Sequence, residues 1–246
     1  MYDRDFLKAD LWEGFDSIES DQRKGLPIPE MQKPVPPGAK IVELIPYEKM
    51  TAGRMPVIEA IARRESRRKF TGESIDLETL SFLLWATQGV KKIAPNKKWI
   101  QRTVPSGGAR HPFETYLLVN HVEGLEKGLY RYLGIEHRLC LLSNEPGLAK
   151  KIHKGSNDQF VLPSAVTFIW TVIPYRTEWR YTRVSAKLIA QDSGHLCQNL
   201  YIACEAVGLG TCAIGAYNQK LMDAAIGVDG QDEFVVYMAP VGRIKS

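Results

Sequence analysis

The sequence has little of what several classes of protein require. No apolar run reaches the length of a membrane-spanning helix, and no cationic start followed by an apolar run marks a signal peptide. The four cysteines (Cys140, Cys197, Cys204 and Cys212) form no CxxC pair, and the histidines show no metal-ligand spacing. We therefore expect a cytoplasmic protein with buried, reduced thiols, no membrane contact and no bound metal.

The charge is nearly balanced, which argues against a dedicated nucleic-acid binder. The 246 residues include 32 basic and 28 acidic side chains, a formal net charge of +4. Nucleic-acid-binding domains usually carry a larger and clustered excess of positive charge, so we expect no nucleic-acid partner. With 44% hydrophobic and 24% charged residues, the composition is that of a globular protein with a substantial core.

Residues 1–54 differ in composition from the rest of the chain. Segment 25–46 contains six prolines, which remove backbone donors and favour extended structure. Apolar residues between Phe6 and Phe15 precede it. We expect a short N-terminal helix and a proline-rich arm that wraps around a surface, with a disordered leader as the open alternative. Residues 55–246 are expected to form the main domain.

Residues 55–246 show an alternation of helix and strand patterns. Pro56 and Asp76 are suitable starts for two helices, and Gly89 is a suitable end for the second. Further helices are predicted at 147–154, 185–207 and 219–226, and strands at 113–119, 129–133, 139–142, 166–173 and 234–241. The basic and polar residues 91–102 are predicted to form a loop. The mixed order indicates an α+β fold with helices packed on a central sheet.

The octet Arg63–Phe70 places five cations and one hydroxyl after a short apolar run. Guanidinium groups bind phosphate bidentately, and a serine hydroxyl can fill a remaining site on the anion. A nucleotide-like ligand is one interpretation. A solvated basic helix end, or a patch that attracts polyanions, is the other.

Several blocks of the sequence together resemble the FMN-dependent nitroreductase superfamily. They are Arg64–Phe70, similar to an RxSxRxF phosphate motif; Leu83–Gly89; Pro105–Glu114, similar to a PSAGALYPLE block; Asp192–Leu200, followed by Gly208–Thr211; and Gly242–Arg243. The PSAG-like block and the DxGH–QN pattern are most similar to the SagB-type dehydrogenases, which oxidise thiazoline and oxazoline rings in peptides.

The resemblance implies a nitroreductase-like fold, with a mixed or antiparallel sheet flanked by helices, in an intertwined homodimer with FMN at the interface. Arg64, Ser66 and Arg68 would hold the phosphate and the polar edge of the flavin, and Arg243 beside Gly242 would be a second phosphate ligand. A loop of Pro105, Ser106 and Gly107 would line the flavin ring of the other subunit. A backbone amide in the segment Ala213–Ala216, which includes Ile214 and Gly215, would face flavin N5. Glu65 and Gln198 belong to the same matching blocks, although a purely structural role is the favoured interpretation of Gln198.

The implied reaction passes a hydride from NADH or NADPH through flavin N5 to a small organic acceptor, such as a nitroaromatic compound or a quinone. Arg180 and Tyr181 align with a Lys-Tyr pair that assists proton removal in the azoline-oxidising branch. Because arginine stays protonated, Arg180 is a poor general base, which favours the reductase over the dehydrogenase. Azoline oxidation on a peptide is the alternative, and FMN storage or polyanion binding is the non-enzymatic alternative.

Overall fold

The computed structural model describes residues 4–96 and 98–245. The α-helices are α1 (Val57–Arg63), α2 (Leu77–Gln88), α3 (Leu148–Gly155), α4 (Tyr175–Tyr181), α5 (Ser185–Ala206) and α6 (Gln219–Ile226). The strands are β1 (Ile41–Glu43), β2 (Val90–Ile93), β3 (Ile100–Arg102), β4 (Phe113–Val119), β5 (Gly128–Leu133), β6 (Arg138–Ser143), β7 (Val166–Val172), β8 (Leu209–Thr211) and β9 (Phe234–Arg243). The strands and helices predicted after residue 112 agree closely with these elements.

A seven-stranded sheet forms the centre of the molecule. Its order is β1-β6-β5-β4-β7-β9-β8, and every neighbouring pair is antiparallel. The two central strands, β4 and β7, are buried along their whole length, as their apolar and β-branched residues predict. The α+β fold with a central sheet flanked by helices is therefore confirmed.

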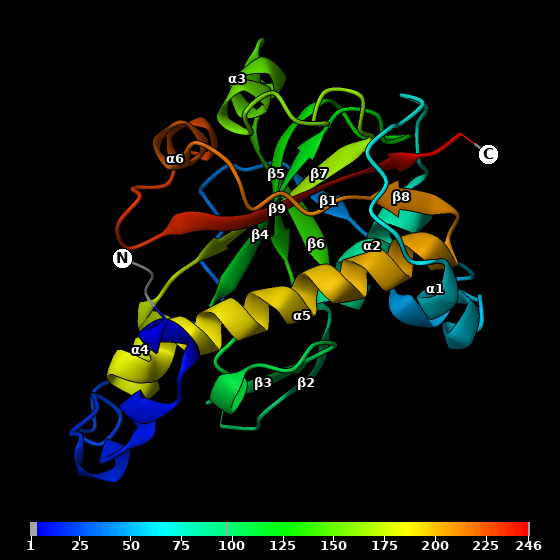
Figure 1. Cartoon of the computed structure of the whole chain (residues 1–246). Helices are drawn as coiled ribbons and strands as arrows, with labels where there is room; N and C mark the ends of the chain where they lie inside the picture. Colours follow the sequence, from blue (N-terminus) through cyan, green and yellow to red (C-terminus); the bar gives the residue numbers. More distant parts are fainter. Residues whose placement is uncertain (1–3, 97, 246) are drawn as a thin grey trace.

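Helices cover both faces of the sheet. Alternate residues of each strand point to opposite faces, and each face carries its own cluster of buried apolar side chains. Leu117 and Phe168 belong to the core under α2 and α5, whereas Leu118 and Ile169 belong to the core under α3 and α6. The helix α5 is the longest, and Figure 1 shows it running diagonally across its face of the sheet. All four cysteines are free and buried.

Helix α1 turns its apolar stripe away from this core. Val57, Ile58 and Ile61 are 67%, 75% and 60% exposed, and Ala60 is the buried residue of this helix. The apolar pattern therefore predicted the helix correctly. It did not show that this apolar face of the helix is exposed to solvent in a single chain.

Two local predictions were wrong. The N-terminal helix is replaced by three short 3-10 turns at Asp5–Leu7, Asp10–Trp12 and Phe15–Ser17. The loop predicted for 91–102 contains the β2–β3 hairpin instead. The arm also contributes β1 to the edge of the main sheet, where it pairs with β6.

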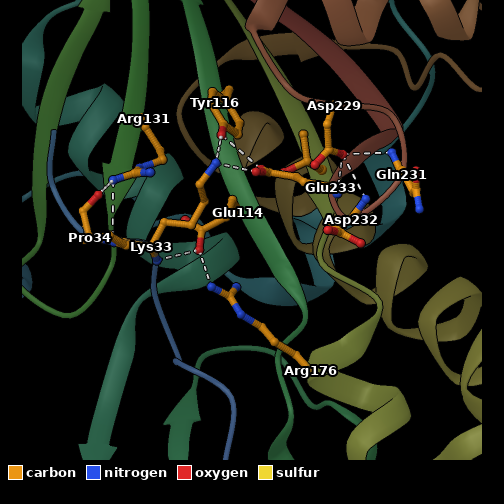
Figure 2. Close-up of polar contacts among 11 residues, drawn as sticks. Lys33, Pro34, Glu114, Tyr116, Arg131, Arg176, Asp229, Gln231, Asp232 and Glu233 are labelled. Carbon is orange, nitrogen blue, oxygen red and sulfur yellow. Dashed lines mark hydrogen bonds and ion pairs between the residues drawn. The ribbon is translucent and has the colours of Figure 1, made fainter.

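A buried polar cluster fixes the arm to the sheet (Figure 2). The backbone amide of Lys33 donates to Glu114 at 3.0 Å, and its ammonium group contacts Glu233 and Tyr116. Glu114 also accepts from Arg176 at 2.6 Å, with both side chains buried. Because Arg176 lies in α4 and Glu114 in β4, the cluster joins the arm, the sheet and this helix.

Among the described residues, no helix combines the length and the apolar character that crossing a bilayer requires. Within the same part of the chain, no group of three or more histidine, cysteine or acidic side chains is placed to hold a metal ion.

Candidate active site

Arg63 is the last residue of α1, and the rest of the basic octet forms an irregular segment that lies along strands β8 and β9. The amide of Arg67 donates to the carbonyl of Thr211, and the amide of Thr71 donates to the carbonyl of Arg243, both at 2.9 Å. Arg67 pairs with Glu65 at 2.9 Å and with Glu205 of α5 at 3.3 Å. These pairs neutralise one cation of the octet and engage the carboxylate of Glu65, so neither group is offered to an anionic ligand.

Arg64, Ser66 and Arg68 have a different environment. Within the described part of the chain, neither Arg64 nor Arg68 pairs with an acid. The guanidinium of Arg64 lies 5.5 Å from the ring centre of Tyr201. The Arg68 side chain makes its one hydrogen bond to a described residue with the carbonyl of Ser66, at 3.5 Å. The Ser66 hydroxyl lies 2.9 Å from the Tyr201 hydroxyl. Two uncompensated guanidiniums and a hydroxyl are therefore available to an anion.

The segment after β8 lies against the same tyrosine. The amide of Ala213 donates to the Tyr201 hydroxyl at 2.8 Å. The amide of Ile214 donates to the carbonyl of Met238 at 2.8 Å, so it is not free to face a ligand. Gly215 is exposed, and among the described residues its amide has no partner. Of the expected segment Ala213–Ala216, the amides of Ala213 and Ile214 are therefore engaged, which leaves those of Gly215 and Ala216 among the described residues.

Gly242 and Arg243 lie at the end of β9, beside the octet. A Cβ atom on Gly242 would come within 3.1 Å of Phe70, so glycine permits the close approach of the two segments. Arg243 is exposed and donates through Nε to the carbonyl of Ser74 at 2.8 Å. This bond leaves the two terminal nitrogens of Arg243 without a protein partner in the described residues.

The predicted ring-lining loop is fixed to the first half of α5 by Asp192. The Ser106 hydroxyl donates to this carboxylate at 2.6 Å, and the amide of Gly107 donates at 3.2 Å. Burial raises the pKa of Asp192, against the opposing effect of these two donors. Pro105, which precedes them, is exposed. One buried carboxylate therefore sets the position of the loop.

Arg180 and Tyr181 end helix α4 on the other side of this loop. A Cβ atom on Gly108, where φ is +55°, would come within 2.5 Å of the Tyr181 hydroxyl. The Tyr181 ring packs against Trp12 and Phe15 of the N-terminal arm, with centroids at 5.9 and 6.1 Å. The Arg180 guanidinium lies 5.3 Å from the centre of the same ring. The arm thus covers one side of the residues predicted to be catalytic.

The geometry of α5 separates the Ser106–Gly107 loop from the Arg64–Arg68 segment. Asp192 and Tyr201 are nine residues apart on α5, which gives about 14 Å of rise and a rotation of about 180°. Gln198 is exposed and lies on the side of Tyr201. In one chain, the Ser106–Gly107 loop and the Arg64–Arg68 segment therefore face away from each other across α5.

A hollow of about 820 Å³ in the described part of the chain is lined by none of the predicted site residues. It lies between the start of α4, the first half of α5 and the start of β9, and apolar side chains such as Ile189, Phe234 and Val236 line it.

The sequence model of the nitroreductase family matches residues 61–243. The chain belongs to the nitroreductase family. It is therefore an oxidoreductase, and the match includes the octet, the Ser106–Gly107 loop, α5 and Arg243.

The chain is also similar to individual proteins of known sequence or structure. A Methanocaldococcus jannaschii protein provisionally named as a nitroreductase is 27% identical over 185 residues, 75% of this chain and 89% of the relative. The trifolitoxin-processing protein of Rhizobium leguminosarum bv. trifolii is 28% identical over 166 residues, 63% of this chain and 43% of the relative. A solved Ralstonia eutropha structure, also provisionally named as a nitroreductase, has a TM-score of 0.69 at 21% identity and covers 86% of this chain and 93% of its own.

Two residues that organise the site were not identified from the sequence as such. Tyr201 joins Ser66 to Ala213, and Asp192 holds the Ser106–Gly107 loop. Asp192 belongs to a block that resembles the family, but the sequence does not show that its partner, Ser106, lies 86 positions earlier. Tyr201 directly follows that block, and nothing in its position indicates that it contacts Ser66, 135 positions earlier.

Proposed function

We propose that the protein is an FMN-dependent oxidoreductase that uses NADH or NADPH to reduce a small organic acceptor. The observation that carries this proposal is the group formed by Arg64, Ser66 and Arg68. Among the described residues, its two guanidiniums have no acidic partner, whereas Arg67 beside them is paired twice. If the segment were only a solvated basic helix end, there would be no reason for one arginine to be paired with acids while Arg64 and Arg68 are not.

The residues present fit flavin mononucleotide. A phosphate with nearly two negative charges suits Arg64, Ser66 and Arg68, with the free nitrogens of Arg243 on the same side of the fold. The exposed amide of Gly215 is a suitable donor to the ring nitrogen that gains electrons. When bound, the flavin supplies the hydride chemistry, and the protein binds, orients and tunes it.

We infer a homodimer in which each flavin contacts both chains. The Ser106–Gly107 loop and the Arg64–Arg68 segment of one chain face opposite sides of α5, so a second copy can place its loop against the first copy's basic segment. The outward stripe of α1 and the 820 Å³ apolar hollow are two surfaces for such a copy to cover. The four free cysteines suit a reducing compartment such as the cytoplasm.

The other residues of the site bind and orient rather than exchange protons. Asp192 keeps the Ser106–Gly107 loop in place, so the loop can exclude water from one face of the ring. Arg180 remains charged and attracts an anionic donor or substrate. Tyr181 has its ring fixed by Trp12 and Phe15, which leaves its hydroxyl as a hydrogen-bond donor beside Gly108.

The test begins with the visible spectrum of the purified protein and the mass of any released flavin. We expect a yellow protein that releases FMN and is bleached by NADH or NADPH without oxygen. A nitroaromatic compound or a quinone should then restore the colour. Colourless protein that takes up no FMN when reconstituted would refute the flavin assignment, and failure of both nicotinamides to bleach bound FMN would refute the reductase.

The alternative is oxidation of azoline rings in a peptide. It is favoured by the similarity to the trifolitoxin-processing protein and by the position of Tyr181. Arg180, in place of the expected lysine, opposes it. Incubation with a thiazoline-containing peptide would test it, since each oxidised ring loses two hydrogen atoms. If neither the natural chain nor the variant Arg180→Lys causes this mass change, the alternative is wrong.

A further inference from the structure

A second cavity, of about 380 Å³, lies beside the Gly108–Arg110 end of the loop. Its walls come from the N-terminal arm at Gln22, from the segment before β3 at Lys98 and Trp99, and from the last turn of α4 at Trp179 and Arg180. Two bonds fix the arm here: the amide of Gln22 donates to the carbonyl of Trp179 at 2.9 Å, and the Trp179 indole donates to the carbonyl of Leu26 at 3.1 Å. Figure 1 shows α4 beside the start of α5 and the β2–β3 hairpin below the first half of this helix.

The charge of this cavity is uncompensated. Lys98, Arg110 and Arg180 line it, and no described carboxylate does. Arg110 is only 6% exposed, yet no acid pairs with it in the described part of the chain. A buried cation without an acidic partner is costly, so a protein that keeps one usually has a use for it.

Arg110 is held in place through part of its guanidinium only. Its Nε donates to the carbonyl of Arg176 at 3.0 Å, and its face lies 5.0 Å from the ring centre of Trp179. The structure gives its two terminal nitrogens no hydrogen bond within the described residues. Burial lowers the pKa of Arg110, and the charges of Arg180 and Arg176 lower it further. Arg176 is itself neutralised by Glu114, so Arg110 and Arg180 are the two arginines near the cavity that no described carboxylate neutralises.

We propose that this cavity binds a small organic oxyanion, with a carboxylate or phosphate head held by Arg110 and Arg180 and a flat apolar body against Trp99. Planar guanidiniums suit both kinds of head, and the volume is within the range of small-ligand pockets. Gly108 lines the cavity and touches Tyr181, so the bound molecule lies beside the residue predicted to donate a hydrogen bond. Its role as a substrate anchor rests on the proposed function, whereas anion binding itself does not.

The experiment is calorimetric titration of the purified full-length protein with benzoate, phenyl phosphate and, as the neutral counterpart, benzyl alcohol. We expect both anions to bind with millimolar or lower dissociation constants, and much more tightly than the alcohol. Tighter binding of phenyl phosphate assigns a phosphate head, and tighter binding of benzoate assigns a carboxylate head. If neither anion binds more tightly than benzyl alcohol, the proposal is wrong.

Variants locate the binding. Arg180→Gln, at an exposed position, should weaken anion binding about tenfold or more, since it removes a charge-assisted partner. Arg110→Gln should do the same if it folds; if it does not, Arg180→Gln carries the test. The control Arg138→Gln removes an exposed arginine of β6 that pairs with Glu43. An equal loss in this control, or no loss in Arg180→Gln, would refute the site.

Flavin content separates this proposal from the proposed function. Arg180→Gln should retain as much FMN as the natural chain, and a loss of FMN would show that this cation serves the flavin instead. A protein that binds benzoate but never takes up FMN would refute the proposed function and leave the anion site standing.

Discussion

Replacement of Lys33 by methionine should destabilise the protein far more than the same change at another lysine of the arm. The Lys33 ammonium contacts the Glu233 carboxylate, which is only 6% exposed and otherwise accepts from the hydroxyls of Tyr116 at 2.9 Å and Thr171 at 2.6 Å. Removing one partner of a buried ion pair costs about 3–5 kcal/mol. Because the Lys33 side chain is 33% exposed, we expect about 2 kcal/mol, which for a chain of this size lowers the melting temperature by about 4–8 °C.

The matched control is Lys40→Met. Lys40 also belongs to the arm and pairs with one glutamate, Glu126, but its side chain is 65% exposed and that of Glu126 is 39% exposed. A surface pair of this kind contributes about 0–1 kcal/mol. Thermal unfolding of both variants, and of Lys33→Met combined with Glu233→Gln, provides the test. The second change should restore part of the stability, because it removes the unpaired buried charge. Equal effects of Lys33→Met and Lys40→Met would refute the reasoning.

Three further predictions concern the site. Arg64→Ala should weaken FMN retention about tenfold to a hundredfold in equilibrium dialysis. The control Arg63→Ala, which removes an exposed cation paired with Glu59 at 3.6 Å, should not weaken it. Equal losses in the two variants would indicate that FMN is held by general charge attraction. Gly108→Ala should lower turnover and shift the melting temperature down by a few degrees, because the new Cβ meets the Tyr181 hydroxyl and φ there is positive; unchanged kinetics would mean that Tyr181 plays no part. Burial, with the charge of Arg102, lowers the pKa of His111 from 6.5 to about 3, so the unfolded chain binds a proton in a range where the folded one does not. As the pH is lowered from about 6.5 to about 3, the free energy of unfolding should therefore fall by up to about 1.4 kcal/mol per pH unit. The variant His111→Asn, in which asparagine tolerates the positive φ of this position, should lack this dependence. Parallel curves of stability against pH for the natural chain and the variant would contradict the prediction.

The regular elements could be predicted because their patterns are local. The segments 113–119 and 219–226 were predicted with the bounds that the structure has, since each is a periodic apolar run between clear end signals. The β2–β3 hairpin was missed for the opposite reason. Lys91 and Lys92 lie in β2, whose last three residues are exposed, so the strand shows neither an apolar run nor an alternation.

The contacts that organise the site depend on residues far apart in the sequence. Lys33 and Glu233 are 200 positions apart, and Ser106 and Asp192 are 86 apart. Matching blocks identified Ser106 without showing what holds it. The same limit applies to Ile214: its block indicated a free amide, but only the pairing with β9 shows that this amide is already bonded.

Strand β1 has a consequence for any shortened form of the chain. It pairs with β6 at one end of the sheet, ahead of the part that the family model matches. Cutting the chain before residue 55 would leave the backbone donors and acceptors of β6 open to pairing with other molecules, and an open edge of this kind promotes aggregation. The arm thus acts as a cover for the sheet, and a truncated enzyme would tend to form β-aggregates before its chemistry could be measured.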